Sequence, residues 1–305
     1  MRADAPGRHQ GRVLTGIALI VAAAVIFPAT DAIAKHLASR YHPLQILWAR
    51  YLVQLAMMLP LLTRRSLGSL LRSRRPALQI GRSLTLVLGT LAFVGALRFI
   101  PLVDAIAILF SNALIMVALS APLLGERIDG RRWAAVIAGF AGTLIIMRPG
   151  LGFVHWAASL ALIAALCNAL FQIASRALAT SDPAETSLVY VALVGVLAMG
   201  PFMPFVWAPM TAEAWLWSAG SAAFAVSGQY LLVKAFNHAP VSVLAPFNYM
   251  EILSATALGY FWFGELPDGW TVLGLVVVIG SGLYVVTREG GRKQAAALPT
   301  SSADR

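Results

Sequence analysis

Several ionisable residues of this chain lie inside long apolar stretches, where a charge is expensive to bury. Glu251 follows Asn248 by three residues, so both share one helix face, and Pro246 lies just before them. An ionisable group at the centre of a bilayer costs roughly 2.5–3.5 kcal/mol, so its presence there indicates a function. A carboxyl group beside a proline bend suits the binding of a substrate amine or the transfer of a proton. The alternative is a hydrogen bond between helices, worth about 0.6 kcal/mol.

Three more charged residues lie in the first two apolar stretches. Asp31 and Lys35 are four residues apart, which places them on one helix face, and we expect them to form an ion pair. The pair either anchors the end of the first helix or gates a pathway there. Arg50 lies about two turns inside the second stretch and needs an acidic partner or an anionic ligand. It either lines a substrate site or pairs with Asp31.

Neutral polar side chains mark further candidate positions. The residues expected to line a substrate site are Arg50, Ser111, Asn112, Gln229, Tyr230, Asn248 and Glu251. Gln172 and Arg176 lie 141 residues after Asp31 and Lys35, so they are candidates for a second gate. Polar side chains also hold membrane helices together by hydrogen bonds, and that reading stays open for each of them.

The composition of the chain fits a bilayer better than water. Hydrophobic residues make up 59% and charged residues 12%, whereas soluble domains carry roughly a quarter charged residues. The net charge of +10 comes from short basic blocks between apolar runs, which argues against nucleic-acid binding. The single cysteine, Cys167, is expected to be a packing residue, and neither a metal site nor a cofactor is expected.

Ten apolar stretches are long enough to cross a membrane as helices, which takes about 20 residues each. They lie at 13–34, 43–62, 78–99, 102–124, 132–148, 154–178, 186–208, 213–236, 241–264 and 270–287. If the N-terminus is cytoplasmic, the basic residues near the outer helix ends are only Lys35, Arg40, Arg98 and Arg148. Because basic residues concentrate on the cytoplasmic side, we expect an inner-membrane protein with both termini in the cytoplasm. The segments 1–12 and 288–305 are predicted to be disordered cytoplasmic tails.

The chain repeats itself with a fixed offset of 139 residues. The matched positions include Gly89 with Gly228, Ala96 with Ala235, Pro101 with Pro240, Gly125-Glu126 with Gly264-Glu265, and Asp129-Gly130 with Asp268-Gly269. Such a match indicates a duplication, here of residues 13–148 into residues 154–287. Each half holds five spans, and because five is odd the second half must be inserted upside down. Asn112 falls on Glu251 under the same offset, and sites in inverted-repeat transporters lie near the midplane between the halves.

These features resemble the drug/metabolite transporter superfamily, in its ten-helix EamA-like branch. The resemblance rests on Asp31-Ala-Ile-Ala-Lys35, Arg50, Ala96 to Pro101, Gly125-Glu126, Ala235 to Pro240, Ala245-Pro246 and Gly264-Glu265. It implies a secondary transporter of small metabolites with two inverted five-helix repeats. The family often has a proline in the middle of span four, whereas this chain has Ala113 there and Ile252 at the matching position. That departure argues against a matched helix break in both halves.

The function expected from the sequence is secondary transport of a small polar metabolite across the bacterial inner membrane. We expect an exporter that works by alternating access, with import of a metabolite or vitamin-like compound as the alternative and a non-transporting scaffold as a remote one. The chain has no phosphate-cradling G-x-x-x-x-G-K-[ST] motif, so protons are the candidate coupling ion. The histidines are scattered, so no catalytic residues and no enzyme activity are expected. Membrane lipid is an expected partner, and a homodimer is left open.

Overall fold

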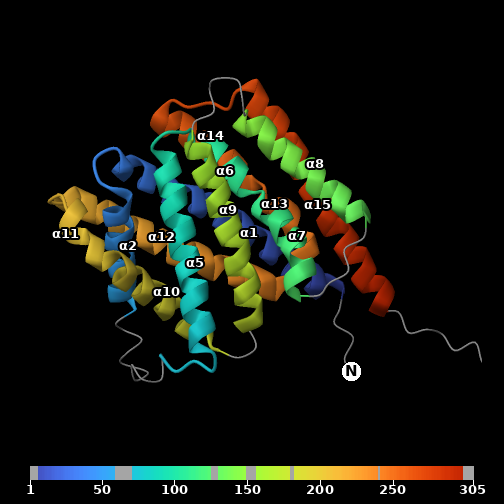
Figure 1. Cartoon of the computed structure of the whole chain (residues 1–305). Coiled ribbons are helices and arrows are strands. Elements are labelled where there is room, and N and C mark those ends of the chain that lie inside the picture. The colour runs from blue at the N-terminus through green and yellow to red at the C-terminus, as the bar shows by residue number, and fades with distance from the viewer. Residues whose placement is uncertain are drawn as a thin grey trace, which may run out of the picture.

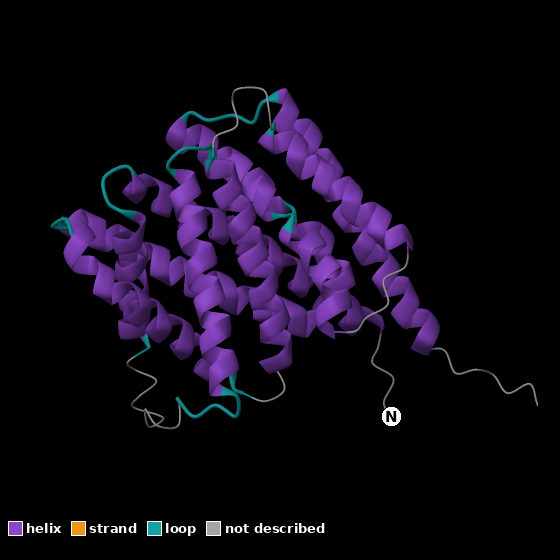
Figure 2. Cartoon of the chain, in the orientation of Figure 1, coloured by secondary structure: helices purple, strands orange, loops and turns teal. Residues whose placement is uncertain are grey.

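The computed structural model describes residues 6–58, 71–124, 130–148, 156–178, 182–239 and 241–297, and all regular secondary structure in these ranges is helical (Figure 2). The first half contains α1 (Pro6–Ala38), α2 (Pro43–Met57), α5 (Pro76–Leu97), α6 (Leu102–Leu109), α7 (Asn112–Leu124) and α8 (Gly130–Met147). The second half contains α9 (Ala157–Leu178), α10 (Ala184–Met199), the 3-10 helix η1 (Gly200–Phe202), α11 (Met203–Val206), α12 (Ala212–His238), α13 (Val241–Asn248), α14 (Met250–Phe263) and α15 (Gly269–Ala297).

Each of the ten predicted spans is helical in its described part, so the chain is the expected all-α membrane protein. Span four consists of α6 and α7, span seven of α10 to α11, and span nine of α13 and α14. By length and apolar composition, five described segments can cross a membrane: Arg12–Ala38, Pro76–Leu97, Leu102–Leu119, Ala157–Ser175 and Glu185–Val206. Helix also extends further than expected, because α1 begins at Pro6 and α15 ends at Ala297. The prediction of disorder is therefore wrong for residues 6–12 and 288–297.

The two halves are inverted relative to each other. α8 and α15 are the fifth helices of their halves, and they lie side by side in Figure 1. Arg148 directly after α8 forms an ion pair with Asp268 directly before α15, so α8 ends where α15 begins. Equivalent helices therefore run in opposite directions, as the odd number of spans per half requires.

The packing of the helices follows the same symmetry. α1 packs along α12, and its equivalent α9 packs along α5, the equivalent of α12. The pair α1 and α14 is likewise mirrored by α9 and α7. These contacts join one half to the other, so the midplane site expected from the sequence would be bounded by both repeats.

Glycines that match in the repeat lie at matching contacts. A Cβ atom added to Gly89 in α5 would lie 2.7 Å from the Cβ of Cys167 in α9. At the equivalent contact, a Cβ on Gly228 in α12 would lie 3.0 Å from the ring of Phe27 in α1. Both helix pairs need the close approach that glycine permits. Cys167 is thus a packing residue, as expected.

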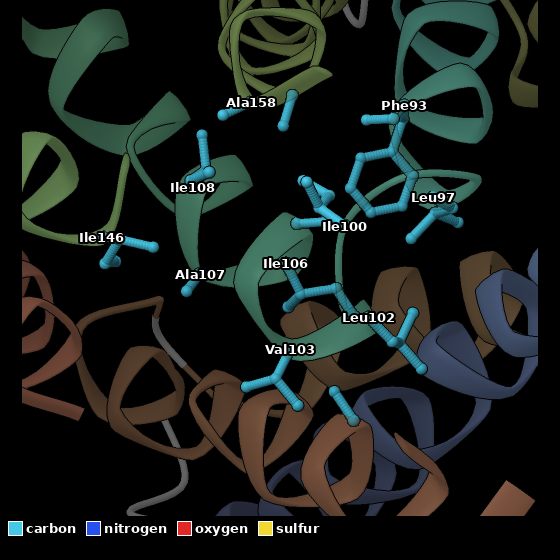
Figure 3. Packing of buried hydrophobic residues seen from close by; sticks show 14 of the residues in the cluster. Phe93, Leu97, Ile100, Leu102, Val103, Ile106, Ala107, Ile108, Ile146 and Ala158 are labelled. Atoms are coloured by element: carbon cyan, nitrogen blue, oxygen red, sulfur yellow. The ribbon is translucent and has the colours of Figure 1, made fainter. Parts of the chain in front are cut away.

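α6 lies at the centre of the bundle and is surrounded by α1, α5, α8, α9, α14 and α15. Its apolar residues point in all directions, which is typical of a fully buried helix. Leu102, Val103, Ile106, Ala107 and Ile108 are each at most 1% exposed, and Figure 3 shows them packed between neighbouring helices. The break that follows α6 therefore lies deep inside the molecule.

Candidate functional site

Spans four and nine are both broken in the middle, at equivalent residues. Phe110 lies in the break between α6 and α7, and Tyr249 lies in the break between α13 and α14, 139 residues later. Their rings stack, with centroids 5.3 Å apart. The sequence argued against a matched break because neither Ala113 nor Ile252 is a proline, and that prediction is wrong.

Different local chemistry produces the two breaks. In span nine, Pro246 has no N–H and its ring disturbs the preceding turn. The N–H of Tyr249 then donates to the carbonyl of Pro246 at 3.4 Å, three residues back instead of four. In span four, the buried hydroxyl of Ser111 donates to the carbonyl of Ile108 at 2.7 Å and competes with the helical ladder. The two breaks thus share their position in the repeat but not their local sequence.

Three charged residues from three helices near these breaks interact electrostatically. Asp31 of α1 interacts electrostatically with Arg50 of α2 and with Glu251. Glu251 is the second residue of α14, directly after the break. Asp31 and Glu251 are intermediate in burial as whole residues. We call Asp31, Arg50 and Glu251 the charged cluster. The sequence proposed each of them separately, and the structure brings them together.

Arg50 is the most deeply buried member of the charged cluster, with 8% of its surface exposed. Its Nη2 donates to the hydroxyl of Tyr51 over a long 3.5 Å, and its guanidinium lies 5.1 Å from the centre of that ring. Its Nε has no hydrogen-bond partner among the residues that the structure describes. Among the described residues, no carboxylate forms an ion pair with Arg50 within 4.0 Å. The alternative in which Arg50 pairs directly with Asp31 is therefore not what the structure shows.

An uncharged cluster occupies the symmetry-related contact. The amide of Asn112 in α7 donates to Asn168 Oδ1 in α9 at 3.2 Å, and Gln172 Nε2 donates to the same oxygen at 2.7 Å. We call these three residues the amide cluster. Asn112 is the repeat partner of Glu251, and Gln172 is the repeat partner of Asp31. The same contact between halves is thus acidic on one side of the pseudo-two-fold axis and neutral on the other.

The remaining residues that were predicted to line a substrate site are Asn248, Gln229 and Tyr230. Asn248 and Gln229 are half-buried, at the end of α13 and within α12. Tyr230 is 62% exposed, and Lys234 lies over its ring, 5.4 Å from the centre. Within the described residues, Tyr230 makes no hydrogen bond or ring contact with the charged or amide cluster, so the structure does not bring it to the site.

The end of α1 is tied to the second half of the chain by Lys35. Lys35 Nζ lies 2.6 Å from both oxygens of Glu265 and donates to the carbonyl of Ile100 at 3.1 Å. Glu265 also accepts from the N–H of Leu102 at the start of α6, at 3.1 Å. The expected ion pair between Asp31 and Lys35 is therefore wrong. The long lysine side chain reaches Glu265 and the carbonyl of Ile100, whereas Asp31 interacts electrostatically with Arg50 and Glu251.

Sequence reasoning missed Glu265 and its neighbours as functional candidates. Arg148 pairs with Asp268, whose carboxylate also accepts from the N–H of Thr271 at 2.9 Å. The hydroxyl of Thr271 donates to Asp104 of α6 at 2.9 Å. The signal was the repeated Gly-Glu-x-x-Asp-Gly turn, which indicated a duplication but also supplies the acids that join α6, α8 and α15. Arg176, predicted at the second gate, has a side chain outside the described part of the structure.

The opposite end of the bundle is held by Asp182, between α9 and α10. Its carboxylate accepts from Ser73 Oγ at 2.5 Å, from the N–H of Arg74 at 3.0 Å and from Gln79 Nε2 at 3.0 Å. These bonds, first of all the one from Ser73, hold the pKa of Asp182 below its usual value. Asp182 thus links the two halves at the end opposite to Lys35.

Comparison with known proteins agrees with this architecture. The chain is 27% identical over 278 residues to an S-adenosylmethionine uptake transporter of Rickettsia conorii, covering 90% of this chain and 94% of that protein. It is 28% identical over 241 residues to a riboflavin transporter of Rhizobium johnstonii, covering 77% and 78% of the two chains. It is also 26% identical over 271 residues to a pseudopaline exporter of Pseudomonas aeruginosa, covering 87% and 93%.

One solved crystal structure of a protein shares the fold, with a TM-score of 0.61 at 18% identity, over 93% of this chain and 99% of the other. The sequence model of the EamA-like transporter family matches twice, at residues 14–148 and 155–287. The two matches fall on the two inverted halves whose breaks, glycines and interfaces correspond. This chain is a multi-pass membrane protein that belongs to the EamA-like transporter family.

Proposed function

We propose that this protein is a secondary transporter that moves a small polar metabolite through the interface between its two halves. The observation that carries the proposal is the charged cluster, which places two carboxyl groups and a buried arginine at that interface, and the Nε of this arginine has no hydrogen-bond partner among the described residues. Burying such groups is costly, and a structural scaffold gains nothing from it. A transport site gains a means to bind a polar solute away from lipid.

The proposed mechanism is alternating access, with the charged cluster between two gates. At one end, Lys35 and Glu265 join α1 to the turn between α14 and α15. We assign this end to the periplasm, following the distribution of basic residues. Gln172 and Arg176 would lie at the cytoplasmic gate. A transporter that an ion pair closes at its periplasmic end can accept substrate from the cytoplasm, which favours export.

Import is the second candidate direction. The relatives named S-adenosylmethionine uptake transporters span 90% of this chain at 27% identity, close to the values for the relative named as an exporter. S-adenosylmethionine is a small polar metabolite with cationic centres, so Asp31 and Glu251 suit it chemically. It is the first substrate to test in either direction.

Protons are the proposed coupling ion. Glu251 is a carboxyl group that a transport cycle can protonate and deprotonate when the gates alternate.

Membrane lipid is the proposed environment of the helices. Their outer faces carry exposed apolar side chains such as Phe205, Leu216 and Phe261, exposed to 84%, 73% and 83%. Such faces fit the acyl chains of a bacterial inner membrane.

The test is transport by the purified protein in proteoliposomes, with radiolabelled S-adenosylmethionine and riboflavin supplied inside or outside and an imposed pH gradient. We expect one metabolite to move. Whether the pH gradient drives it into or out of the vesicles distinguishes import from export. A comparison of metabolites in cells with and without the gene extends the search to other compounds. The proposal fails if no compound moves in vesicles and no compound changes in cells.

A further inference from the structure

The helices α8 and α15 leave a groove open between them on the surface of the molecule. Its volume is about 470 Å³, within the range of about 300–1,000 Å³ that small-molecule sites occupy. Its walls include Ala134, Ala135 and Ala138 of α8 and Val277, Gly280 and Tyr284 of α15. The hydroxyl of Ser281, which also lines it, is used within α15, where it donates to the carbonyl of Val278 at 2.9 Å. The groove therefore fits a hydrocarbon chain better than a polar solute.

The groove is closed at one end and open at the other. Towards the end of α8 the two helices touch, because a Cβ on Gly142 would lie only 2.9 Å from the carbonyl oxygen of Gly274. Further along α15, a Cβ added to Gly280 would meet nothing within 4 Å. A chain lying in the groove would thus enter from the side on which α8 starts.

Two arginines lie opposite each other at this open end. α8 and α15 run antiparallel, and Gly139 and Ser281 are opposite each other, since a Cβ on Gly139 would touch the hydroxyl of Ser281. About two turns nearer the start of α8 is Arg131, and the same distance further along α15 is Arg288. Like charges at facing positions repel each other, and an anion between the helix ends would relieve this repulsion.

The sequence around these two positions is basic as well. The basic residues at this end of the helix pair are Arg131, Arg132, Arg288, Arg292 and Lys293. Residues 285–297 contain a single acid, Glu289. In Figure 1, α15 continues past the start of α8, so its basic segment extends beyond the groove.

Two aromatic residues mark the depth of this end in a membrane. Trp133 of α8 is 42% exposed, and Tyr284 of α15 is 40% exposed. Tryptophan and tyrosine are enriched where a bilayer meets water, at the level of the lipid head groups. The groove thus extends from this level towards the apolar interior, with the basic helix ends on its aqueous side.

We propose that the groove between α8 and α15 binds one anionic phospholipid, with an acyl chain between the two helices and its phosphate at the level of Arg131 and Arg288. Basic pockets between membrane helices bind anionic head groups in this way. The site is separate from the proposed transport pathway, because the charged cluster lies on α1, α2 and α14. The lipid would hold together the fifth helices of the two halves.

The test is native mass spectrometry of the purified protein in a neutral detergent. It counts bound dioleoyl-phosphatidylglycerol and dioleoyl-phosphatidylcholine, which have the same acyl chains and are added at equal concentration. We expect one phosphatidylglycerol to be retained per chain, with a preference of about fivefold or more over phosphatidylcholine. Excess inorganic phosphate should not displace it, because a soluble anion gains nothing from the groove.

Variants separate the contributions of the head group and the acyl chain. Arg131→Gln combined with Arg288→Gln should weaken binding of phosphatidylglycerol about tenfold, whereas Arg40→Gln combined with Arg98→Gln removes two exposed charges elsewhere and should not. Ala138→Leu fills the groove and should reduce retention of the lipid. Ala56→Leu, at an exposed position of α2, is its control.

The inference is overturned if the two lipids are retained equally, if the Arg40 and Arg98 variant loses as much lipid as the Arg131 and Arg288 variant, or if phosphate displaces the lipid. Retention that is unchanged in Ala138→Leu would place the lipid outside the groove. A dimer that persists without lipid and separates in Ala138→Leu would assign the groove to a second copy of the chain instead.

Discussion

Glu251 is the residue on which proton coupling depends in the proposed cycle. Gln has nearly the same shape but takes up no proton, so Glu251→Gln should remove the dependence of transport on a pH gradient, or abolish transport. Uptake by proteoliposomes with and without a gradient measures this, with the exposed Glu213→Gln as control. Full transport with unchanged pH dependence in Glu251→Gln would exclude a proton-carrying role for this residue.

Asp182 makes a pH-dependent contribution to stability at the opposite end of the bundle. Its pKa is lowered by bonds from Ser73, Arg74 and Gln79, so it stabilises the fold while it is ionised. This contribution is complete above the unfolded pKa of about 3.9 and is lost as the pH falls through the lower folded pKa.

Asp182→Ala should therefore lower the melting temperature at pH 7 by about 2–4 °C, the effect of roughly 1 kcal/mol. At pH 3 the difference between the variant and the parent should be smaller. Thermal unfolding in detergent at the two pH values measures it. An equal difference at both values would show that ionisation of Asp182 does not stabilise the fold.

The charged residues show which parts of the candidate site could be predicted from the sequence. Asp31, Arg50 and Glu251 were recognisable because charge is rare in apolar stretches, but their meeting depends on helices that lie far apart in the chain. The partner of Lys35 was mispredicted for a related reason. Spacing along one helix identifies Asp31 as a neighbour, whereas Glu265 lies 230 residues away and is reached only through the inverted packing.

At the scale of elements, the turn between α14 and α15 depends on one left-handed residue. Gly264 has φ +68°, and its N–H donates to the carbonyl of Tyr260 at 3.0 Å. That bond is the one that defines the αL motif at a helix end, and the N–H of Glu265 also donates to the carbonyl of Gly259 at 2.9 Å. This geometry ends α14 and points Glu265 towards Lys35.

Gly264→Ala should therefore destabilise the protein by about 1–2 kcal/mol, the cost of a left-handed conformation for a residue with a Cβ. The melting temperature should fall by about 2–8 °C. Gly269→Ala is the matched control, because an added Cβ there meets nothing within 4 Å and φ is not left-handed. Equal stability of the two variants would contradict this account of the turn.

The helix breaks show the limit of sequence reasoning at this scale. The number and order of the spans followed from apolar stretches, because a bilayer requires them. The break at Phe110 did not, because Ser111 breaks a helix only where its hydroxyl turns to the carbonyl of Ile108. A serine in a membrane helix is common, and its sequence context does not distinguish a break from a bond between helices.

At the scale of the whole molecule, the tie between Lys35 and Glu265 should hold one end of the transporter closed. Val103 lies beneath it, 1% exposed, with its side chain 3.6 Å from where a Cβ on Gly259 would lie. Opening that end would separate α6 from α14 and expose Val103. Labelling of Val103→Cys by a membrane-impermeant thiol reagent, in a Cys167→Ala background, reports the opening.

Labelling should be slow in the parent and several-fold faster after Glu265→Gln, because the variant loses the charge that binds Lys35. Ser39→Cys, at an exposed position just after α1, should label quickly in both and is the control. Fast labelling of Val103→Cys with Glu265 present, or no change after Glu265→Gln, would show that this ion pair is not a gate.

The orientation of the whole molecule gives the last prediction. The ion pair between Arg148 and Asp268 places the end of α8 and the start of α15 at one face, and Lys35 with Glu265 lies at that face too. Asp182 with Ser73 lies at the other face. The distribution of basic residues assigns the first face to the periplasm. Reporter fusions after Arg148 and after Pro267 should therefore both report the periplasm, and a fusion after Asp182 should report the cytoplasm. If the first two fusions report different compartments, the inverted arrangement of the halves is wrong; if both report the cytoplasm, the arrangement stands, the orientation is reversed, and Lys35 and Glu265 close the cytoplasmic end instead.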